Sequence, residues 1–217
     1  ARARWAIRFW GPERYQQSVK SYYRLISGVD VVVGRIREKL QELGADQNTV
    51  IVFTSDHGFY LGEYGLAGKW FPHELSIRVP LIVFDPRLPV ERRGTRRDEM
   101  VLNIDVARTL LDTAGVEAPA TMQGNSLLPL VRGEAPAWRK EFFYEHLFHH
   151  PGLAKSEAVR TERWKYMRYV ETNPLHEELY DLARDPYETH NLAGEPGYRA
   201  ILDDLRQRHD RLRTAAK

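Results

Sequence analysis

The polar residues that follow the apolar segment 50–53 could hold a metal ion. The segment is continuous, apolar and rich in β-branched residues, which is typical of a strand buried on both faces of an α/β sheet. Asp56 and His57 come directly after its carboxyl end, where open α/β sheets place their ligands. A carboxylate beside a neutral imidazole suits a divalent metal when further carboxylates join it. We therefore predict Asp56 and His57 as ligands of a metal site that needs further groups to be complete.

The segment after His57 has the composition of a tight loop that ends on a cation. Four glycines recur in it: Gly58, Gly62, Gly65 and Gly68. They allow the chain to fold closely over the strand end and to bring Lys69 back toward it as a point charge for an anion. A lysine held near a metal ion would be costly without an anion to neutralise both. The pattern thus predicts a metal site and an anion site side by side.

A long helix is expected before this strand. Pro12 suits a first helical position, Gly44 suits a C-cap, and apolar residues recur every three or four positions over 19–43. The same stripe could belong to a coiled coil. Gly28 and Gly34 within it, and the strand that follows, favour packing against a sheet.

The remainder of the chain predicts a second strand, a helix and then a small sheet. Residues 79–84 have the pattern of another buried strand, and a helix capped by Asn103 or Asp105 restores the βα alternation of a mostly parallel sheet. From residue 141 the pattern is that of an antiparallel sheet, followed by an amphipathic helix from about residue 198. We expect two domains, 1–136 and 137–217.

Three segments resemble the type I sulfatases of the alkaline phosphatase superfamily. They are residues 51–85 (IVFTSDHGFYLGEYGLAGKWFPHELSIRVPLIVFD), residues 178–192 (ELYDLARDPYETHNL), and the hairpin 158–166 (AVRTERWKY). The hairpin is similar in style to the N-acetylglucosamine-6-sulfatase and iduronate-2-sulfatase branches. The resemblance extends from about residue 15 to residue 192 and implies an α/β fold: the C-terminal part of a mixed sheet between helices, plus a small antiparallel sheet with a C-terminal helix.

The resemblance also implies a reaction and a set of site residues. The reaction is the hydrolysis of a sulfate ester, here of a sulfated saccharide, at a calcium (Ca2+) centre held in part by Asp56 and His57. Lys69 is implied as the sulfate-binding, catalytic cation, with His73 and His146 as further substrate contacts. Fixed cations would stabilise the charge that spreads over the sulfuryl oxygens in the transition state.

Two motifs of that family are not found in these residues. They are a paired-Asp metal motif and the C/S-x-P-x-R pattern whose Cys or Ser becomes formylglycine, the nucleophile; the chain has no cysteine. The chain begins at Ala1. We therefore expect it to be the C-terminal portion of a sulfatase, to be inactive alone, and to bind its N-terminal half or to self-associate.

Several polar residues have structural alternatives. Glu74 and Arg78 could form an ion pair that fixes the Lys69 loop, or they could contact the substrate directly. We prefer the ion pair. The C-terminal carboxylates at 181, 185 and 188 are interpreted as turn formers, with Asn191 closing the turn. His209 is expected to pack at the final helix, and the spacing of the histidines at 146, 149 and 150 favours a loop near a substrate entrance over a zinc site.

Composition excludes few functions. The chain has 217 residues and a net charge of +2, which does not favour nucleic acid, and no segment reaches the roughly 20 apolar residues of a membrane span. The basic run 92–97 is interpreted as a solvated loop. The compartment is open, and the family allows a periplasmic, secreted or lysosomal-type one. Two other functions stay open: a phosphate or phosphonate ester hydrolase of the same superfamily, and a non-catalytic module that binds sulfated glycans.

Overall fold

The structure is a computed structural model that describes residues 2–216. The chain divides into two compact units, each assembled from separate segments. The first unit combines the described residues up to Gly28, the segment His57–Val79 and the residues from Lys140 onward. The second combines Val29–Asp56 and Pro80–Arg139. The segment that carries Lys69 therefore belongs with the C-terminal sheet, whereas a division at residue 136 would place it with the preceding domain.

Two helices open the chain, α1 (Arg2–Phe9) and the long α2 (Pro12–Glu42). Helix α2 begins at the predicted Pro12, and Gly44 follows its end with a φ of 62°, the left-handed conformation that a C-cap glycine adopts. None of the residues of α2 is buried, and Ile26, Val29 and Ile36 are each about half exposed. The predicted packing of this apolar stripe of α2 against a sheet therefore stays a prediction.

The second unit contains a two-stranded sheet of β1 (Ile51–Thr54) and β4 (Leu81–Phe84). The strands pair antiparallel, with Ile51 opposite Phe84, an arrangement that the predicted mixed sheet allows. A parallel pair needs a long crossover, usually a helix of several turns, and the connection between these strands contains only the four-residue helix α3 (Glu74–Ile77). Strand β1 is half-buried and Ile82 is 60% exposed, so neither strand is buried on both faces as expected.

A helix and a buried ion pair organise the rest of the second unit. Short turns are formed by η1 (Asp46–Asn48) and η3 (Val90–Arg92), and α4 (Ile104–Thr113) contacts α5 (Leu128–Val131). Asp105 is fully buried at the start of α4 and accepts a two-pronged pair of bonds from Arg139 at 2.6 and 2.7 Å. It also accepts the backbone N–H of Leu102, which precedes the helix, at 2.7 Å; the N-cap residue Asn103 makes no side-chain cap bond, so the predicted cap is not formed.

The first unit is built on a four-stranded antiparallel sheet with the order β5-β6-β7-β8. Its strands are β5 (Glu141–His146), β6 (Ser156–Thr161), β7 (Trp164–Tyr169) and β8 (His176–Asp181). Because side chains alternate along a strand, the sheet has two apolar faces. One carries Val159, Tyr166 and Leu179, which pack on Leu202 and Leu205 of α6 (Arg199–Ala215), and η4 (Pro196–Tyr198) precedes that helix.

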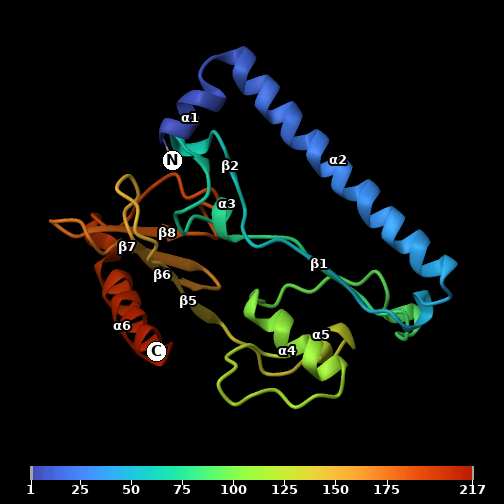
Figure 1. The fold of residues 1–217 in the computed structure, drawn as a ribbon. Coiled ribbons are helices and arrows are strands. Elements are labelled where there is room, and N and C mark those ends of the chain that lie inside the picture. The colour runs from blue at the N-terminus through green and yellow to red at the C-terminus, as the bar shows by residue number, and fades with distance from the viewer. Residues whose placement is uncertain (1, 217) are drawn as a thin grey trace. The chain divides into compact units, whose positions relative to one another are not determined.

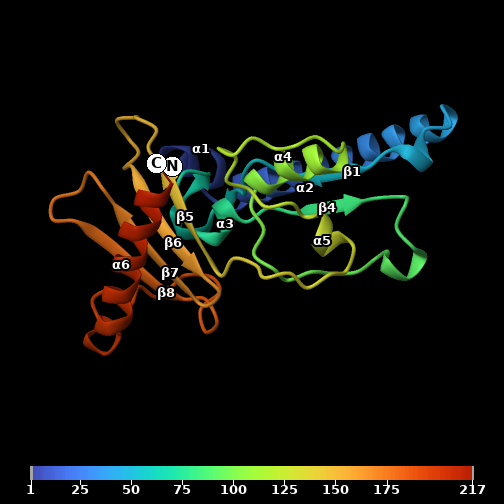
Figure 2. The same cartoon turned by 90° about the horizontal axis from the view of Figure 1, so that it is seen from below.

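The other face of this sheet carries Ala158, Met167 and Tyr180. On that side lies the segment with α3, so α3 and α6 are on opposite sides of the sheet (Figures 1 and 2). The segment also contains β2 (Tyr60–Leu61), η2 (Glu63–Gly65) and β3 (Ala67–Gly68), with β2 and β3 antiparallel. Near its start a Cβ on Gly58 would lie 2.2 Å from the carbonyl oxygen of Leu75, so only glycine allows this close approach.

The predicted fold class is confirmed in its main features. The structure is a mixed α/β arrangement with a small antiparallel sheet and a C-terminal helix. Within residues 2–216, no helix is both long and apolar enough to span a membrane.

A candidate anion site around Lys69

Lys69 lies on a turn whose backbone is held in an uncommon conformation. Gly68 has a φ of 94° and Trp70 a φ of 121°, a left-handed value that a bulky residue rarely adopts. The Trp70 N–H donates to Oγ of Ser76 at 3.3 Å, which helps to hold the turn. Strain of this kind persists only where surrounding contacts fix it, and it gathers at functional sites. The conformation of Trp70 therefore marks the Lys69 turn as a constrained part of the first unit.

Two cationic side chains lie near the indole ring of Trp70. The Lys69 ammonium lies 5.8 Å from the ring centroid, and the guanidinium carbon of Arg4 lies 5.5 Å from it. Both distances are within the range of a cation–π contact. Two cations beside one ring create a positive surface suited to an anion.

His146 lies at the same turn. Its ring packs edge-on against Trp70 with a centroid distance of 5.5 Å, and Phe148 stacks on Trp70 at 6.1 Å. Burial lowers the pKa of His146, and the charge of Lys69 lowers it further. The structure thus brings together Lys69 and His146, which are 77 positions apart in the sequence and were both predicted as site residues.

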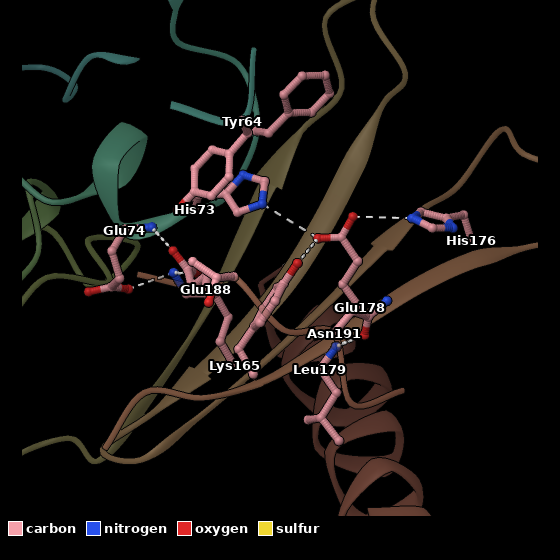
Figure 3. Close-up of polar contacts among 12 residues, drawn as sticks. Tyr64, His73, Glu74, Lys165, His176, Glu178, Leu179, Glu188 and Asn191 are labelled. Atoms are coloured by element: carbon pink, nitrogen blue, oxygen red, sulfur yellow. Dashed lines mark hydrogen bonds and ion pairs between the residues drawn. The ribbon is translucent and has the colours of Figure 1, made fainter. Parts of the chain in front are cut away.

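His73 has a different environment from His146. It is 7% exposed, its Nδ1 lies 2.8 Å from the hydroxyl of Tyr60, and its Nε2 lies 3.5 Å from Oε2 of Glu178 (Figure 3). Its ring also stacks on that of Tyr64 at 4.8 Å. Both ring nitrogens therefore face protein groups, and a substrate contact by His73 stays a prediction.

Glu74, at the start of α3, forms a different ion pair from the one expected. Its carboxylate lies 2.6 Å from the ammonium of Lys165 and 3.6 Å from the guanidinium of Arg160. Burial would raise the pKa of Glu74, but the charges and hydrogen bonds of Lys165 and Arg160 outweigh it and hold the pKa below its ordinary value. The expected pair with Arg78 is therefore wrong: the sheet, and not a neighbour along the chain, supplies the cation.

The two predicted metal ligands follow β1. In the second unit, the amide of Asn103 donates to the carbonyl oxygen of Asp56 at 3.2 Å, which fixes the backbone at the end of the strand. In the first unit, Nδ1 of His57 lies 2.8 Å from the carbonyl oxygen of Gly58. A histidine that donates from Nδ1 carries its lone pair on Nε2, the arrangement that metal-ligating histidines use.

Asp56 belongs to the second unit and His57 to the first, so their shared metal site stays a prediction. A carboxylate and an imidazole with a fixed tautomer are suitable donors, but calcium takes six to eight ligands, mostly oxygens. No group of three or more potential His, Cys, Asp or Glu ligands occurs among residues 2–216. Calcium also accepts carbonyl and water oxygens, so Asp56 and His57 would be two members of a larger ligand set.

The C-terminal carboxylates have separate roles. Asp185 accepts the N–H groups of Thr189 and His190 at 2.7 and 2.9 Å, which is the turn-forming role predicted for it. Asp181 pairs with Arg163 at 2.6 Å. Glu188 is not a simple turn residue, because it is 2% exposed and pairs with Lys165 at 2.7 Å.

Two residues of this environment, Lys165 and Glu178, were not predicted as site residues from the sequence, and neither was the pairing of Glu188 with Lys165. Lys165 occupies an inward-facing position of a predicted strand. A charged residue at such a position could have indicated a buried ion pair. Lys165 lies between Trp164 and Tyr166, so periodicity suggested only a hairpin strand.

Comparisons with known proteins give the family. Residues 62–215 match the family model described as N-sulphoglucosamine sulphohydrolase, C-terminal, and residues 4–116 match the model described as Sulfatase. Each model covers more than half of the chain. This chain belongs to the sulfatase family.

Relatives with sulfatase or alkaline phosphatase superfamily names match most of this chain. It is 36% identical to an N-acetylglucosamine-6-O-sulfatase of Bacteroides thetaiotaomicron over 201 residues, covering 89% of this chain and 35% of the relative. It is 34% identical to a multifunctional alkaline phosphatase superfamily protein of Trinickia caryophylli, covering 89% and 40%. The chain thus spans well under half the length of these relatives.

Solved structures share the fold. One is a protein in complex with its substrate D-glucosamine-2-N,6-O-disulfate, with a TM-score of 0.85, 33% identity, and coverage of 93% of this chain and 41% of that one. Another is the phosphonate monoester hydrolase of Agrobacterium radiobacter, with a TM-score of 0.86, 30% identity, and coverage of 96% and 44%. The predicted membership of the alkaline phosphatase superfamily is confirmed.

Proposed function

We propose that this chain is the C-terminal portion of a sulfuric ester hydrolase that acts on sulfated saccharides, and that Lys69 binds the sulfate group. The observation that carries the proposal is the strained, glycine-framed turn that holds Lys69 against Trp70 and beside His146. Membership of the sulfatase family supports the reaction, and the relative named for N-acetylglucosamine-6-O-sulfate supports the substrate class.

The chemistry assigned to Lys69 is charge neutralisation. Negative charge spreads over the peripheral oxygens of a sulfuryl group as the ester bond breaks, so a fixed ammonium stabilises the transition state more than the ground state. Asp56 and His57 would hold part of a calcium site, and the bound ion would supply further positive charge to the same oxygens. His146, whose lowered pKa favours the neutral ring, would offer a hydrogen bond to the saccharide next to the sulfate.

The nucleophile and the remaining metal ligands would come from the rest of the complete protein. We propose that the exposed stripe of α2 packs on that part, because Ile26, Val29 and Ile36 leave apolar surface in water. The 217-residue chain alone would then hydrolyse no sulfate ester. It would also bind calcium weakly, since affinity follows the number and charge of the ligands.

The test is turnover of a 6-sulfated glucosamine and of an aryl sulfate by the complete protein. We expect Lys69→Ala to abolish most of the activity and Lys155→Ala to leave it unchanged. Lys155 is a matched control because it is a lysine of the same unit whose ammonium pairs with Glu171 at 2.6 Å. Full activity of Lys69→Ala, or turnover by the isolated chain, would contradict the proposal.

A second candidate function is the hydrolysis of a phosphonate or phosphate ester. It is favoured by the match to the phosphonate monoester hydrolase, whose identity and TM-score nearly equal those of the substrate-bound structure. The two functions separate on the ratio of kcat/KM for an aryl sulfate and a phenyl phosphonate at defined metal content. A higher kcat/KM for the phenyl phosphonate than for the aryl sulfate would support phosphonate hydrolysis over sulfate-ester hydrolysis.

A further inference from the structure

A buried lysine on the C-terminal sheet joins two carboxylates of the segments that cover the sheet. The side chain of Lys165, in β7, is fully buried, and its ammonium lies 2.6 Å from Oε1 of Glu74 and 2.7 Å from Oε1 of Glu188 (Figure 3). Arg160 lies opposite Lys165 on β6 and approaches Glu74 at 3.6 Å. Two cations therefore face two carboxylates, and the cluster is neutral as a whole.

Glu188 also holds the backbone at the start of α3. Its Oε2 accepts the N–H of Glu74 at 2.6 Å, so one carboxylate forms an ion pair with the lysine and a hydrogen bond with the first turn of the helix. Glu188 has a φ of 53°, a conformation that costs energy for a glutamate and is maintained by its neighbours. The turn that presents it is closed by Asp185, which accepts two backbone N–H groups.

A second link fixes the residue before Glu74. His73 lies between the Tyr60 hydroxyl at 2.8 Å and the carboxylate of Glu178 at 3.5 Å. Glu178 in turn accepts the hydroxyl of Tyr180 at 2.9 Å and lies 3.1 Å from Nε2 of His176. His73 and Glu74 are thus both anchored on the same face of the sheet.

These anchors lie four and five residues after Lys69. The intervening residues include Trp70, whose left-handed backbone needs both ends of the turn to be fixed. Phe71 packs edge-on against Tyr169 of β7 at 5.8 Å, so the path from Lys69 to Glu74 follows the sheet. Displacement of Glu74 would therefore be transmitted to the Lys69 turn through a short and constrained stretch of chain.

We propose that Lys165 is a positioning residue for Lys69. Its ammonium holds Glu74 and Glu188 together, and in this way it sets the place of the Lys69 turn and its affinity for the sulfate group. This inference rests on the proposed function, because Lys69 must be the anion-binding cation. It assigns to the C-terminal sheet an indirect part in the anion site, through a residue that touches no substrate.

The test compares two variants of the complete protein on the same strand. Lys165→Met removes the ammonium with little loss of volume, and Arg168→Met removes a cation from the other face of the sheet, where Arg168 pairs with the buried Glu157 at 2.8 Å. The readouts are KM and kcat for the sulfated saccharide, and Ki for inorganic sulfate. The value of kcat is normalised to the folded fraction, whereas KM and Ki do not depend on it.

We expect Lys165→Met to lower kcat/KM by roughly 10- to 100-fold, the range in which a small displacement of a remote group acts. The Ki for sulfate should rise in parallel. Arg168→Met should lower the melting temperature and leave Ki unchanged. Unchanged Ki in Lys165→Met, or an equal rise in both variants, would overturn the proposal.

A charge-balanced variant covers the case in which Lys165→Met does not fold. Lys165→Met/Glu188→Gln removes one cation and one anion, and the glutamine keeps an oxygen that can accept the N–H of Glu74. The same rise in Ki is expected in this double variant, and an unchanged Ki overturns the proposal.

Amide exchange separates the inference from the proposed function. If the wild-type protein neither hydrolyses sulfate esters nor binds sulfate, the proposed function fails, and exchange over residues 66–79 decides the positioning role. Faster exchange there in Lys165→Met than in Arg168→Met supports the link between the sheet and the turn. Equal exchange in the two variants overturns it.

Discussion

Both faces of the β5–β8 sheet bury a cluster of opposite charges, but the two clusters join the sheet to different partners. Under α6, Glu157 is 1% exposed and lies 3.1 Å from Nε2 of His209, which is fully buried. On the opposite face, Lys165 is fully buried between Glu74 and Glu188. One cluster holds a helix, and the other holds the segment that leads from Lys69.

This difference shows what the buried charges can do. A buried ion pair adds little net stability, because removal of both ions from water offsets their attraction. The apolar residues under α6, such as Leu202 and Leu205, already hold that helix. The segment 69–74 has apolar contacts of its own, such as Phe71 against Tyr169, and Glu74 adds directional contacts with fixed charged partners. Charged clusters are thus expected to affect stability on one face and the anion site on the other.

The largest expected effect is on the α6 face. Glu157→Leu leaves Arg168, Arg213 and the buried His209 without their shared carboxylate. Loss of one partner of a buried pair costs about 3 kcal/mol or more, so the free energy of unfolding should fall by that order. Urea unfolding measures it, and kcat/KM of the folded fraction should stay unchanged. A loss of sulfate affinity in this variant would remove the distinction between the faces.

Lys69→Ala should have the reverse effect: it should lower kcat/KM and leave the free energy of unfolding nearly unchanged. Removal of one group that stabilises transition-state charge lowers kcat/KM by roughly 100- to 1,000-fold. The urea midpoint should change little, because the ammonium lies against the face of Trp70 and not within either buried cluster. A large fall in stability would show that Lys69 has a structural role instead.

Asn191→Ala should have a smaller effect, on the loop that carries Glu188. The side chain of Asn191 accepts the N–H groups of Leu179 and Ala193, each at 2.9 Å, and donates to the carbonyl oxygen of Glu177 at 3.0 Å. Net contributions of such bonds are about 1 kcal/mol, and stability should fall by that order. Amide exchange should quicken around Glu188 before it changes in α6. Uniform quickening over both faces would contradict this order.

The smallest effects concern pH, and the two faces should respond in different ranges. Burial lowers the pKa of His209 below its ordinary 6.5, so the unfolded chain takes up a proton first and stability falls as pH drops below about 6.5. Burial alone would raise the pKa of Glu178, but hydrogen bonds from His73, Tyr180 and His176 hold it below its ordinary 4.5. The stability that Glu178 contributes is present above about 4.5 and is lost as pH falls further.

Melting temperatures from pH 7 to pH 3 check these ranges. His209→Gln should flatten the decline that begins near 6.5. Glu178→Gln should flatten only the part below 4.5. If either variant flattened the other range, the assignment of the two groups to the two ranges would be wrong.

Local sequence patterns predicted several elements correctly. Pro12 and Gly44 marked the limits of α2, because a missing N–H and a left-handed φ are local properties of those residues. The small antiparallel sheet followed from alternating residues and hairpin turns in the same way. The direction of β1 against β4 did not, because strand pairing depends on how the intervening 26 residues return, and periodicity does not encode that path.

The candidate site shows the same limit. The glycine spacing and the family motifs identified Asp56, His57 and Lys69, since each lies beside its own local signal. Residues 74 and 78 are four apart and suggested an ion pair, but the cation of Glu74 comes from Lys165, which is 91 positions away. A salt bridge across such a distance in sequence leaves no local pattern.

The sequence by itself determined the family of this protein, the limits of its main helix, and the turn that presents Lys69. These depend on backbone preferences and on contiguous motifs. Only the tertiary structure decided which face of the C-terminal sheet meets that turn and which charge is buried there. The reason is physical: a cation and a carboxylate can be buried together only after folding removes both from water, so the choice of partners is made by packing.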